Sequence, residues 1–209
     1  MAAERRDTYT AIATQAQMLY DQGAPPGEAL RQCYGVDLPD EIFIIADSEL
    51  RTRAPSIRFP IQPWRLIPRP GSIEIPREPT GSDSIEKELF RRDSDLFPLA
   101  FLTRREARHG DVLVCYRMSE LAAGRHTVHG VPGVTYRVPA SLDVRSALIS
   151  LGSSLLTVLH EYFTDIFESL EAEADKERAW GTDAIDDESL DRAKGFVDLI
   201  EELLRRSRT

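Results

Sequence analysis

The sequence predicts an α+β fold, in which a small, mostly antiparallel sheet is flanked by N-terminal helices and followed by a long C-terminal helical hairpin. Three observations predict it. Short apolar runs bounded by turn residues, at 97–102, 109–116 and 133–139, have the length and spacing of strands in a meander. Apolar residues recur at helical spacing near the N-terminus and in the last third of the chain. Between them, 51–80 holds seven of the thirteen prolines, which restricts that region to short or edge strands.

Three helices are expected before residue 50. Good helix formers with one apolar stripe cover 3–22, and a second helix at 26–34 tolerates proline in its first turn and ends at Gly35. Asp40 can cap a third helix, although the β-branched residues that follow it would also suit a strand.

The proline-rich segment 51–80 is too apolar for a free linker, and we expect it to wrap around the core in an ordered way. Short strands are predicted at Trp64 to Ile67 and Ser72 to Ile75. The polar stretch 80–95 is predicted to be a mobile loop with a short helix at 84–91.

The C-terminal third shows the clearest periodicity. From 143 to 178, apolar residues step by three or four positions, which predicts one long helix that contains Ser153 and Ser154. A final helix is predicted at 187–206, so that 143–206 forms an antiparallel hairpin. The whole chain, 1–209, is interpreted as a single domain.

The net charge of −9 is unevenly distributed along the 209 residues. Residues 160–209 carry 15 acidic and 7 basic side chains, which together account for most of the excess. Nucleic-acid binding requires clustered Lys and Arg, so this distribution excludes a nucleic-acid partner and favours a basic protein surface, with a solvated helix face as the plainer alternative. No apolar run approaches the roughly 18 residues of a membrane span, and no signal peptide is recognised, so a cytoplasmic protein is expected. Cys33 and Cys115 are predicted to be buried thiols.

Metal-binding patterns are incomplete. His160 and Glu161 begin a helical zinc motif, but Thr164 stands where the second histidine would be. His126 and His129 lie three apart in a glycine-flanked segment without a third ligand nearby. No metal and no cofactor are predicted.

Catalytic patterns are also weak. Ser153 and Ser154 follow a glycine without the elbow that exposes a nucleophile. Asp93 and Asp95 could supply a general acid and base, and so could Asp186 and Asp187, but paired carboxylates on polar loops are frequent.

One basic cluster could bind an anion. Arg104, Arg105 and Arg108 lie beside His109, and guanidinium groups bind phosphate or carboxylate in bidentate fashion. A solvated hairpin loop is the alternative interpretation of this cluster.

The pattern of these segments resembles the SUKH superfamily, bacterial immunity proteins related to a fungal regulator of cell-wall synthesis. The residues that carry the resemblance are Gly35, Leu38 and Pro39, then Phe97 to Phe101, Gly110 with Asp111, and Val138 to Leu148. The last of these stretches corresponds to the passage from the family's last strand into its closing helix. The chain departs from the pattern in its proline-rich middle and in its last sixty residues. The resemblance implies a non-enzymatic protein that neutralises a cognate toxin.

We therefore expect a protein-binding module, most concretely an immunity protein that occludes a basic toxin domain. Two sets of contact residues are predicted: exposed aromatic side chains at Trp64, Tyr116 and Tyr136, and acidic side chains at Glu168, Glu171, Glu173, Asp186, Asp187 and Glu188. Two alternatives stay open. One is a small hydrolase or transferase that uses His109 or His126 on an anionic substrate. The other is a structural or regulatory protein that forms a homodimer through its C-terminal helices.

Overall fold

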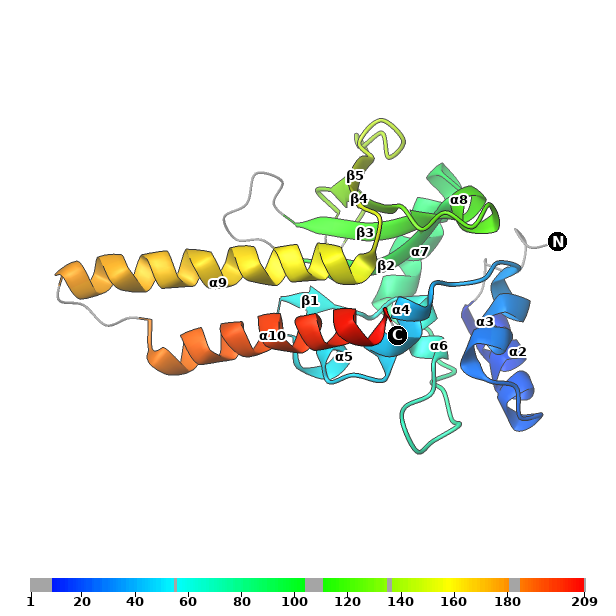
Figure 1. The fold of residues 1–209 in the computed structure, drawn as a ribbon. Coiled ribbons are helices and arrows are strands. Elements are labelled where there is room, and N and C mark those ends of the chain that lie inside the picture. The colour runs from blue at the N-terminus through cyan, green and yellow to red at the C-terminus, as the bar shows by residue number, and fades with distance from the viewer. Residues whose placement is uncertain (1–8, 55, 104–110, 135–136, 181–184, 209) are drawn as a thin grey trace. The chain divides into compact units, whose positions relative to one another are not determined.

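The computed structural model describes residues 9–54, 56–103, 111–134, 137–180 and 185–208. The chain divides into two compact units, Met1–Ser153 and Ser154–Thr209. The N-terminal unit holds the sheet with shorter helices, and the C-terminal unit is a pair of long helices (Figure 1). The predicted α+β class is confirmed.

The sheet of the N-terminal unit is an antiparallel meander. Each strand pairs with its neighbour in sequence, and the order across the described sheet is β1-β2-β3-β4-β5. The strands are β1 (Ile57–Arg58), β2 (Leu96–Leu102), β3 (Val112–Arg117), β4 (Val128–Pro132) and β5 (Ile149–Gly152).

β2 and β3 form the centre of the sheet, and their residues are almost all buried. Phe97 lies opposite Tyr116, and Phe101 lies opposite Leu113. The register shifts between Pro98 and Ala100, where the proline lacks the N–H that a regular ladder would use. The runs predicted as strands at 97–102 and 109–116 are thus confirmed. The third run, 133–139, forms no strand in its described residues, because the strand next to β3 is β4, which ends at Pro132.

The N-terminal helices are α2 (Tyr9–Asp21), α3 (Pro26–Tyr34), α4 (Asp40–Ala46) and the short α5 (Leu50–Arg53). The chain leaves α3 through Gly35, whose φ of 76° lies in the left-handed region that glycine adopts without strain. Residues 40–46 are helical, which decides between the helix and strand interpretations of that run.

Helices α3 and α4 cover one face of the central strands. Tyr34 of α3 packs edge-on against Phe97, with ring centroids 4.9 Å apart. The Tyr116 hydroxyl donates to Glu41 Oε1 of α4 at 2.6 Å. Because Phe97 and Tyr116 are directly opposed in the ladder, their side chains share a face, and both helices pack on it.

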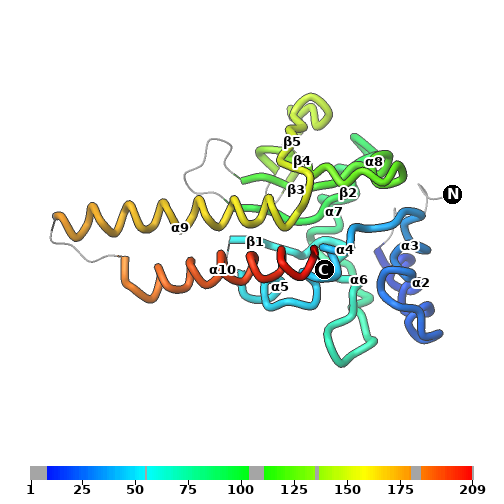
Figure 2. The backbone as a smooth tube through the Cα atoms, in the orientation of Figure 1, coloured from blue at the N-terminus to red at the C-terminus, as the bar shows by residue number. Residues whose placement is uncertain are grey.

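Two strands predicted in the proline-rich segment are not formed. Trp64 to Leu66 belong instead to α6 (Gln62–Leu66), a helix whose first turn accommodates a proline, and Ile67 follows its end. The Ser72 to Ile75 run has no strand partner among the described residues. Its backbone is instead bonded by the Gln17 side chain, which donates to Ile73 O at 3.1 Å and accepts from Ile75 N at 3.2 Å. The chain between α6 and α7 is therefore held against α2 without regular structure (Figure 2).

The polar stretch predicted as a mobile loop is mostly helical. Helix α7 (Gly81–Arg92) is longer than the predicted 84–91 helix because Thr80 and Asp83 organise its start. The Asp83 carboxylate accepts a hydrogen bond from the Thr80 backbone N–H, and it also pairs with Arg65 at 2.9 Å. Ile85 and Leu89 of α7 are buried.

The prediction that the long C-terminal helix begins near 143 is wrong. Asp143 organises a turn, because its carboxylate accepts from the Ser146 hydroxyl at 2.6 Å and from Arg145 N at 3.1 Å. Residues 149–152 then form β5 beside β4. Ser153 and Ser154 precede the helix rather than lying inside it, and Ser154 Oγ accepts a hydrogen bond from Thr157 N at 3.3 Å.

The C-terminal unit is a hairpin of α9 (Leu155–Trp180) and α10 (Asp187–Arg206), which run antiparallel (Figures 1 and 2). The Phe163 and Phe196 rings stack across it with centroids 5.1 Å apart. Arg178 approaches Asp187 at 3.3 Å near the connection. The bounds predicted for α10 are confirmed.

Candidate functional site

Two of the three predicted aromatic contact residues lie in the interior. Trp64 and Tyr116 have no exposed surface. The Trp64 indole Nε1 donates to Leu99 O, and the Tyr116 hydroxyl donates to Glu41. A ring without exposure cannot contact a partner, so the prediction of exposed aromatics at these two positions is wrong. The indole N–H of Trp64 and the hydroxyl of Tyr116 donate to buried acceptors, so neither group is available to a partner. Tyr136 lies outside the described residues.

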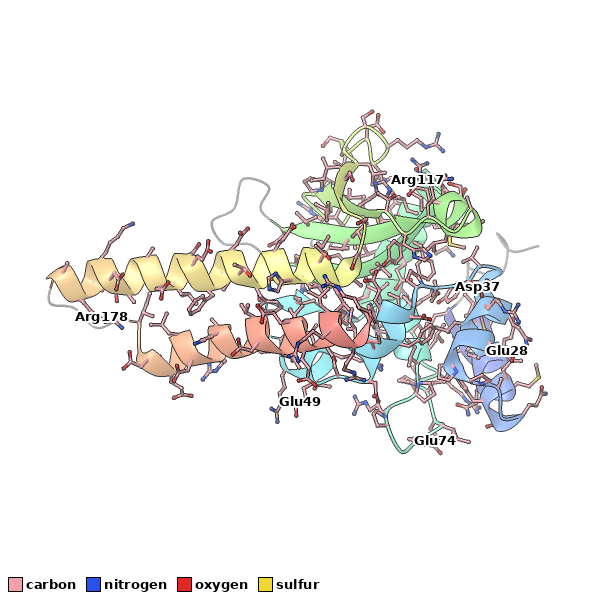
Figure 3. All side chains as sticks on the ribbon, viewed as in Figure 1. Glu28, Asp37, Glu49, Glu74, Arg117 and Arg178 are labelled. Atoms are coloured by element: carbon pink, nitrogen blue, oxygen red, sulfur yellow. The ribbon has the colours of Figure 1, made fainter. Side chains whose placement is uncertain are left out.

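The six predicted acidic residues are all exposed. Glu168, Glu171 and Glu173 lie on α9, and Asp186, Asp187 and Glu188 lie at the start of α10. Because α9 and α10 are antiparallel, both groups belong to the half of the hairpin nearer the connection between the helices. Figure 3 shows the side chains of this unit, with Arg178 labelled at that end. We call these six residues the acidic surface.

The three α10 acids are engaged within the hairpin. Asp186 caps α10 by accepting a hydrogen bond from Ser189 N at 2.9 Å, and hydrogen bonds from Ser189 hold the pKa of Asp186 below its usual value. Asp187 pairs with Arg178 at 3.3 Å, and Glu188 pairs with Arg192 at 2.6 Å. The acidic residues at these three positions are therefore explained by their role at the start of α10, and no binding partner outside the chain is needed to explain them.

The three α9 acids differ from them. Glu168, Glu171 and Glu173 have no ion-pair partner within the described part of the chain. Across its length, α9 carries seven carboxylates against one lysine and one arginine. The uncompensated negative charge of the acidic surface is thus concentrated on α9.

The predicted anion-binding arginines, Arg104, Arg105 and Arg108, lie outside the described residues together with His109. The structure therefore gives no geometry for the arginine loop.

The remaining histidines are not gathered into one site. His126 is exposed, whereas His129 is part of β4 rather than a loop, and its Nε2 lies 2.9 Å from Glu120 Oε2. His160 Nε2 lies 3.5 Å from Glu201 Oε1, across the helical hairpin. In the ranges that the structure covers, no three His, Cys, Asp or Glu side chains are placed to hold a metal ion.

Asp93 and Asp95 act as structural acceptors where the chain enters β2. Asp95 accepts from Arg117 Nε, from Ser119 N and from the Ser119 hydroxyl, each at 2.7 Å. Partial burial tends to raise the pKa of Asp95, but these hydrogen bonds outweigh it and the pKa is lowered. Asp93 is buried, and Arg145 Nε lies 3.6 Å from its Oδ2. An aspartate kept ionised by three hydrogen bonds is not poised to give up a proton.

Both cysteines are buried, and neither forms a disulfide. Burial raises the pKa of the Cys115 thiol far above its usual value. Such a thiol does not ionise near neutral pH, so the geometry does not favour Cys115 as a nucleophile.

One perturbed group was not identified by sequence reasoning. Burial raises the pKa of Glu86 to about 8, and nearby Asp83 raises it further, while Gln62 N–H and Arg65 act in the opposite direction. Glu86 Oε1 accepts a hydrogen bond from Gln62 N at 2.8 Å, so the carboxyl joins α7 to the start of α6. The sequence offers only a weak signal, namely that Glu86 is adjacent to the buried Ile85 on a helix.

No described helix has the length and apolar character needed to cross a bilayer. No protein-family model, curated protein or solved structure matches the chain.

Proposed function

We propose that this chain is a non-enzymatic protein-binding module, and specifically a SUKH-like immunity protein that neutralises a basic toxin domain by occluding it. The observation that carries the proposal is the acidic surface, where Glu168, Glu171 and Glu173 are exposed on α9 and have no ion-pair partner among the described residues.

Electrostatics gives this surface its mechanism. Several like charges on one rigid helix create a field that attracts a basic partner and raises the association rate. Once the partner is bound, a helical hairpin of this length can cover a cleft that would otherwise admit a polyanionic substrate. The attraction is screened by salt over about 10 Å at 0.1 M ionic strength, so binding should weaken as salt is added.

Three of the six acids hold the hairpin together, so they are poor positions at which to test binding. Reversing the charge of Asp186 would remove the cap of α10, and reversing Asp187 or Glu188 would break an internal pair. Glu168 and Glu171 form no such cap or ion pair within the described residues. They are three positions apart on α9, so they lie on one face of the helix. They are therefore the sites at which charge can be changed with the least effect on folding.

The experiment is a retention assay with the purified chain immobilised and exposed to lysate of its source organism. The test variant is Glu168→Lys with Glu171→Lys, and the matched control is Asp198→Lys with Glu202→Lys, which makes the same charge change on exposed positions of α10. Circular dichroism first establishes that both variants keep their helices.

The proposal predicts that the wild type and the control retain one basic protein at low salt, that the test variant does not, and that high salt releases it. Retention that is equal for all three chains would contradict the role of the α9 acids. A retained small metabolite, or turnover of an anionic substrate that Glu168→Lys leaves intact, would instead favour an enzyme.

A further inference from the structure

The N-terminal unit contains a wide groove with a volume of about 1160 Å³. One wall is the turn between α4 and α5, and the other is the proline-rich chain between α6 and α7. Phe59 and Phe101 contribute an apolar floor beside β1. Four arginines also line the groove, namely Arg51, Arg58, Arg65 and Arg69. All of its lining residues belong to this one unit.

Arg51 is fixed in place by neutral acceptors. Its guanidinium donates to Ile67 O at 3.2 Å and to Trp64 O, at the C-terminal end of α6. A guanidinium has five N–H donors, so these two bonds orient the group without using all of them. Among the described residues, Arg51 forms no ion pair with a carboxylate.

Arg69 brings a second positive charge to the groove, from the proline-rich wall. It is exposed and lies between Pro68 and Pro70, whose rings restrict the backbone there. Burial lowers the pKa of Arg51, and the positive charge of Arg69 lowers it further because the two guanidinium groups repel each other. Arg69 also has no carboxylate partner within the described ranges, so the groove is lined by two arginines that lack such a partner there.

The other charges of the groove are arranged differently. Arg65 is paired with Asp83 at 2.9 Å, and Glu49 is paired with Arg53 at 2.7 Å. Figure 3 labels Glu74 on the loop after α6 and Glu49 on the opposite wall. The Arg58 guanidinium lies over the Phe101 ring, 5.2 Å from its centroid. Positive charge and apolar surface therefore meet in the same groove.

We propose that this groove binds a small amphiphilic anion, whose carboxylate or phosphate group contacts Arg51 and Arg69 and whose apolar body packs near Phe59 and Phe101. An oxyanion accepts hydrogen bonds from the remaining Arg51 donors and removes the repulsion between the two arginines. The proposal does not depend on the acidic surface, which belongs to the other unit.

The test uses the full-length chain and a fluorescent probe that has both features, anilinonaphthalene sulfonate. Its binding is titrated by fluorescence under native conditions, and the stoichiometry is measured by calorimetry. The key variant is Arg69→Gln, because Arg69 is exposed and holds no structural bond. Arg77→Gln is the matched control, since Arg77 is an exposed arginine of the same proline-rich segment that does not line the groove. Arg51→Gln is a second variant, interpreted only if its unfolding transition remains cooperative.

We expect saturable binding at one site that Arg69→Gln weakens about tenfold, which corresponds to about 1.4 kcal/mol, because it removes a charge-assisted hydrogen bond. Arg77→Gln should leave the affinity unchanged. Hexyl phosphate and hexanoate then compete with the probe, and the stronger competitor identifies the oxyanion as phosphate or carboxylate. Three results would overturn the proposal. The first is binding of the probe that does not saturate, and the second is equal affinity of Arg69→Gln and Arg77→Gln for the probe. The third is competition by a glutamate-rich peptide but by neither hexyl phosphate nor hexanoate.

Discussion

The Tyr116 hydroxyl donates a hydrogen bond of 2.6 Å to Glu41 Oε1, and both residues are buried between the sheet and α4. Tyr116 lies on β3, the middle strand of the described sheet, so this bond fixes the helix on the sheet at one defined point. Burial raises the pKa of Tyr116 well above its usual value, and the negative charge of Glu41 raises it further, so the phenol remains a donor.

Tyr116→Phe should lower the free energy of unfolding by about 1–3 kcal/mol, because it leaves a buried carboxylate without this donor. Urea unfolding followed by circular dichroism measures the loss. A double-mutant cycle with Glu41→Ala, which removes the acceptor, separates the bond from general packing: the coupling between the two substitutions should be at least about 0.5 kcal/mol. Strict additivity would show that the hydrogen bond contributes nothing to stability.

Gly130 is a position in β4 where a side chain would crowd its neighbours. A Cβ atom there would lie 2.9 Å from Val112 Cγ1 and 3.0 Å from Leu151 Cδ1. Gly130→Ala should therefore destabilise the chain by about 1–3 kcal/mol through overpacking between neighbouring strands. Gly27→Ala is the control, because its Cβ would meet Phe43 at an ordinary 3.7 Å and alanine favours a helix. Equal melting temperatures for the two variants would contradict this account of the sheet.

Glu86 should make stability depend on pH. Its pKa is raised from 4.5 to about 8 in the folded chain, mainly by burial, so the folded state holds a proton that the unfolded state releases. The stabilisation from this proton is complete below about pH 4.5 and is lost as pH rises towards 8. Each unit of pKa shift corresponds to about 1.4 kcal/mol.

Glu86→Gln tests this assignment, because glutamine can still accept from Gln62 N but cannot ionise. The unfolding free energy of the variant relative to the wild type should rise between pH 5 and pH 8. The comparison cancels contributions from other groups, including Asp83 and Arg65, which face the same carboxyl. A difference that stays constant over this range would show that Glu86 titrates at its ordinary pKa.

The sequence predicted elements whose signals are local. The helix of 187–206 follows from its periodicity, and Gly35 marks the end of α3 because only glycine adopts that conformation freely. β2 and β3 were recognisable as apolar runs between turn residues. These features depend on neighbours within a few positions.

Elements that depend on distant partners were missed. The sequence of β5 has the apolar spacing of a helix, and it forms a strand because it pairs with β4. The Ser72 to Ile75 run lacks a strand partner because Gln17, more than fifty residues away, takes the backbone groups instead. Trp64 was predicted to be exposed because no local signal places Leu99 O within reach of its indole.

The candidate site shows the same division. Exposure of the acidic surface could be inferred from charge and helical spacing alone. The sequence could not show which of these acids lack an internal partner, because Arg178 reaches Asp187 only when the chain folds back into a hairpin. The groove of Arg51 and Arg69 was invisible in the sequence, since the two residues are eighteen positions apart in segments without regular periodicity.

The most direct test of the proposed function compares retention of a basic protein by the wild type, by Glu168→Lys with Glu171→Lys, and by Asp198→Lys with Glu202→Lys, at two salt concentrations. Our account predicts that the first and third chains retain the same basic partner at low salt, that the second does not, and that high salt releases it. Undiminished retention by the Glu168→Lys, Glu171→Lys chain, insensitive to salt, would contradict it.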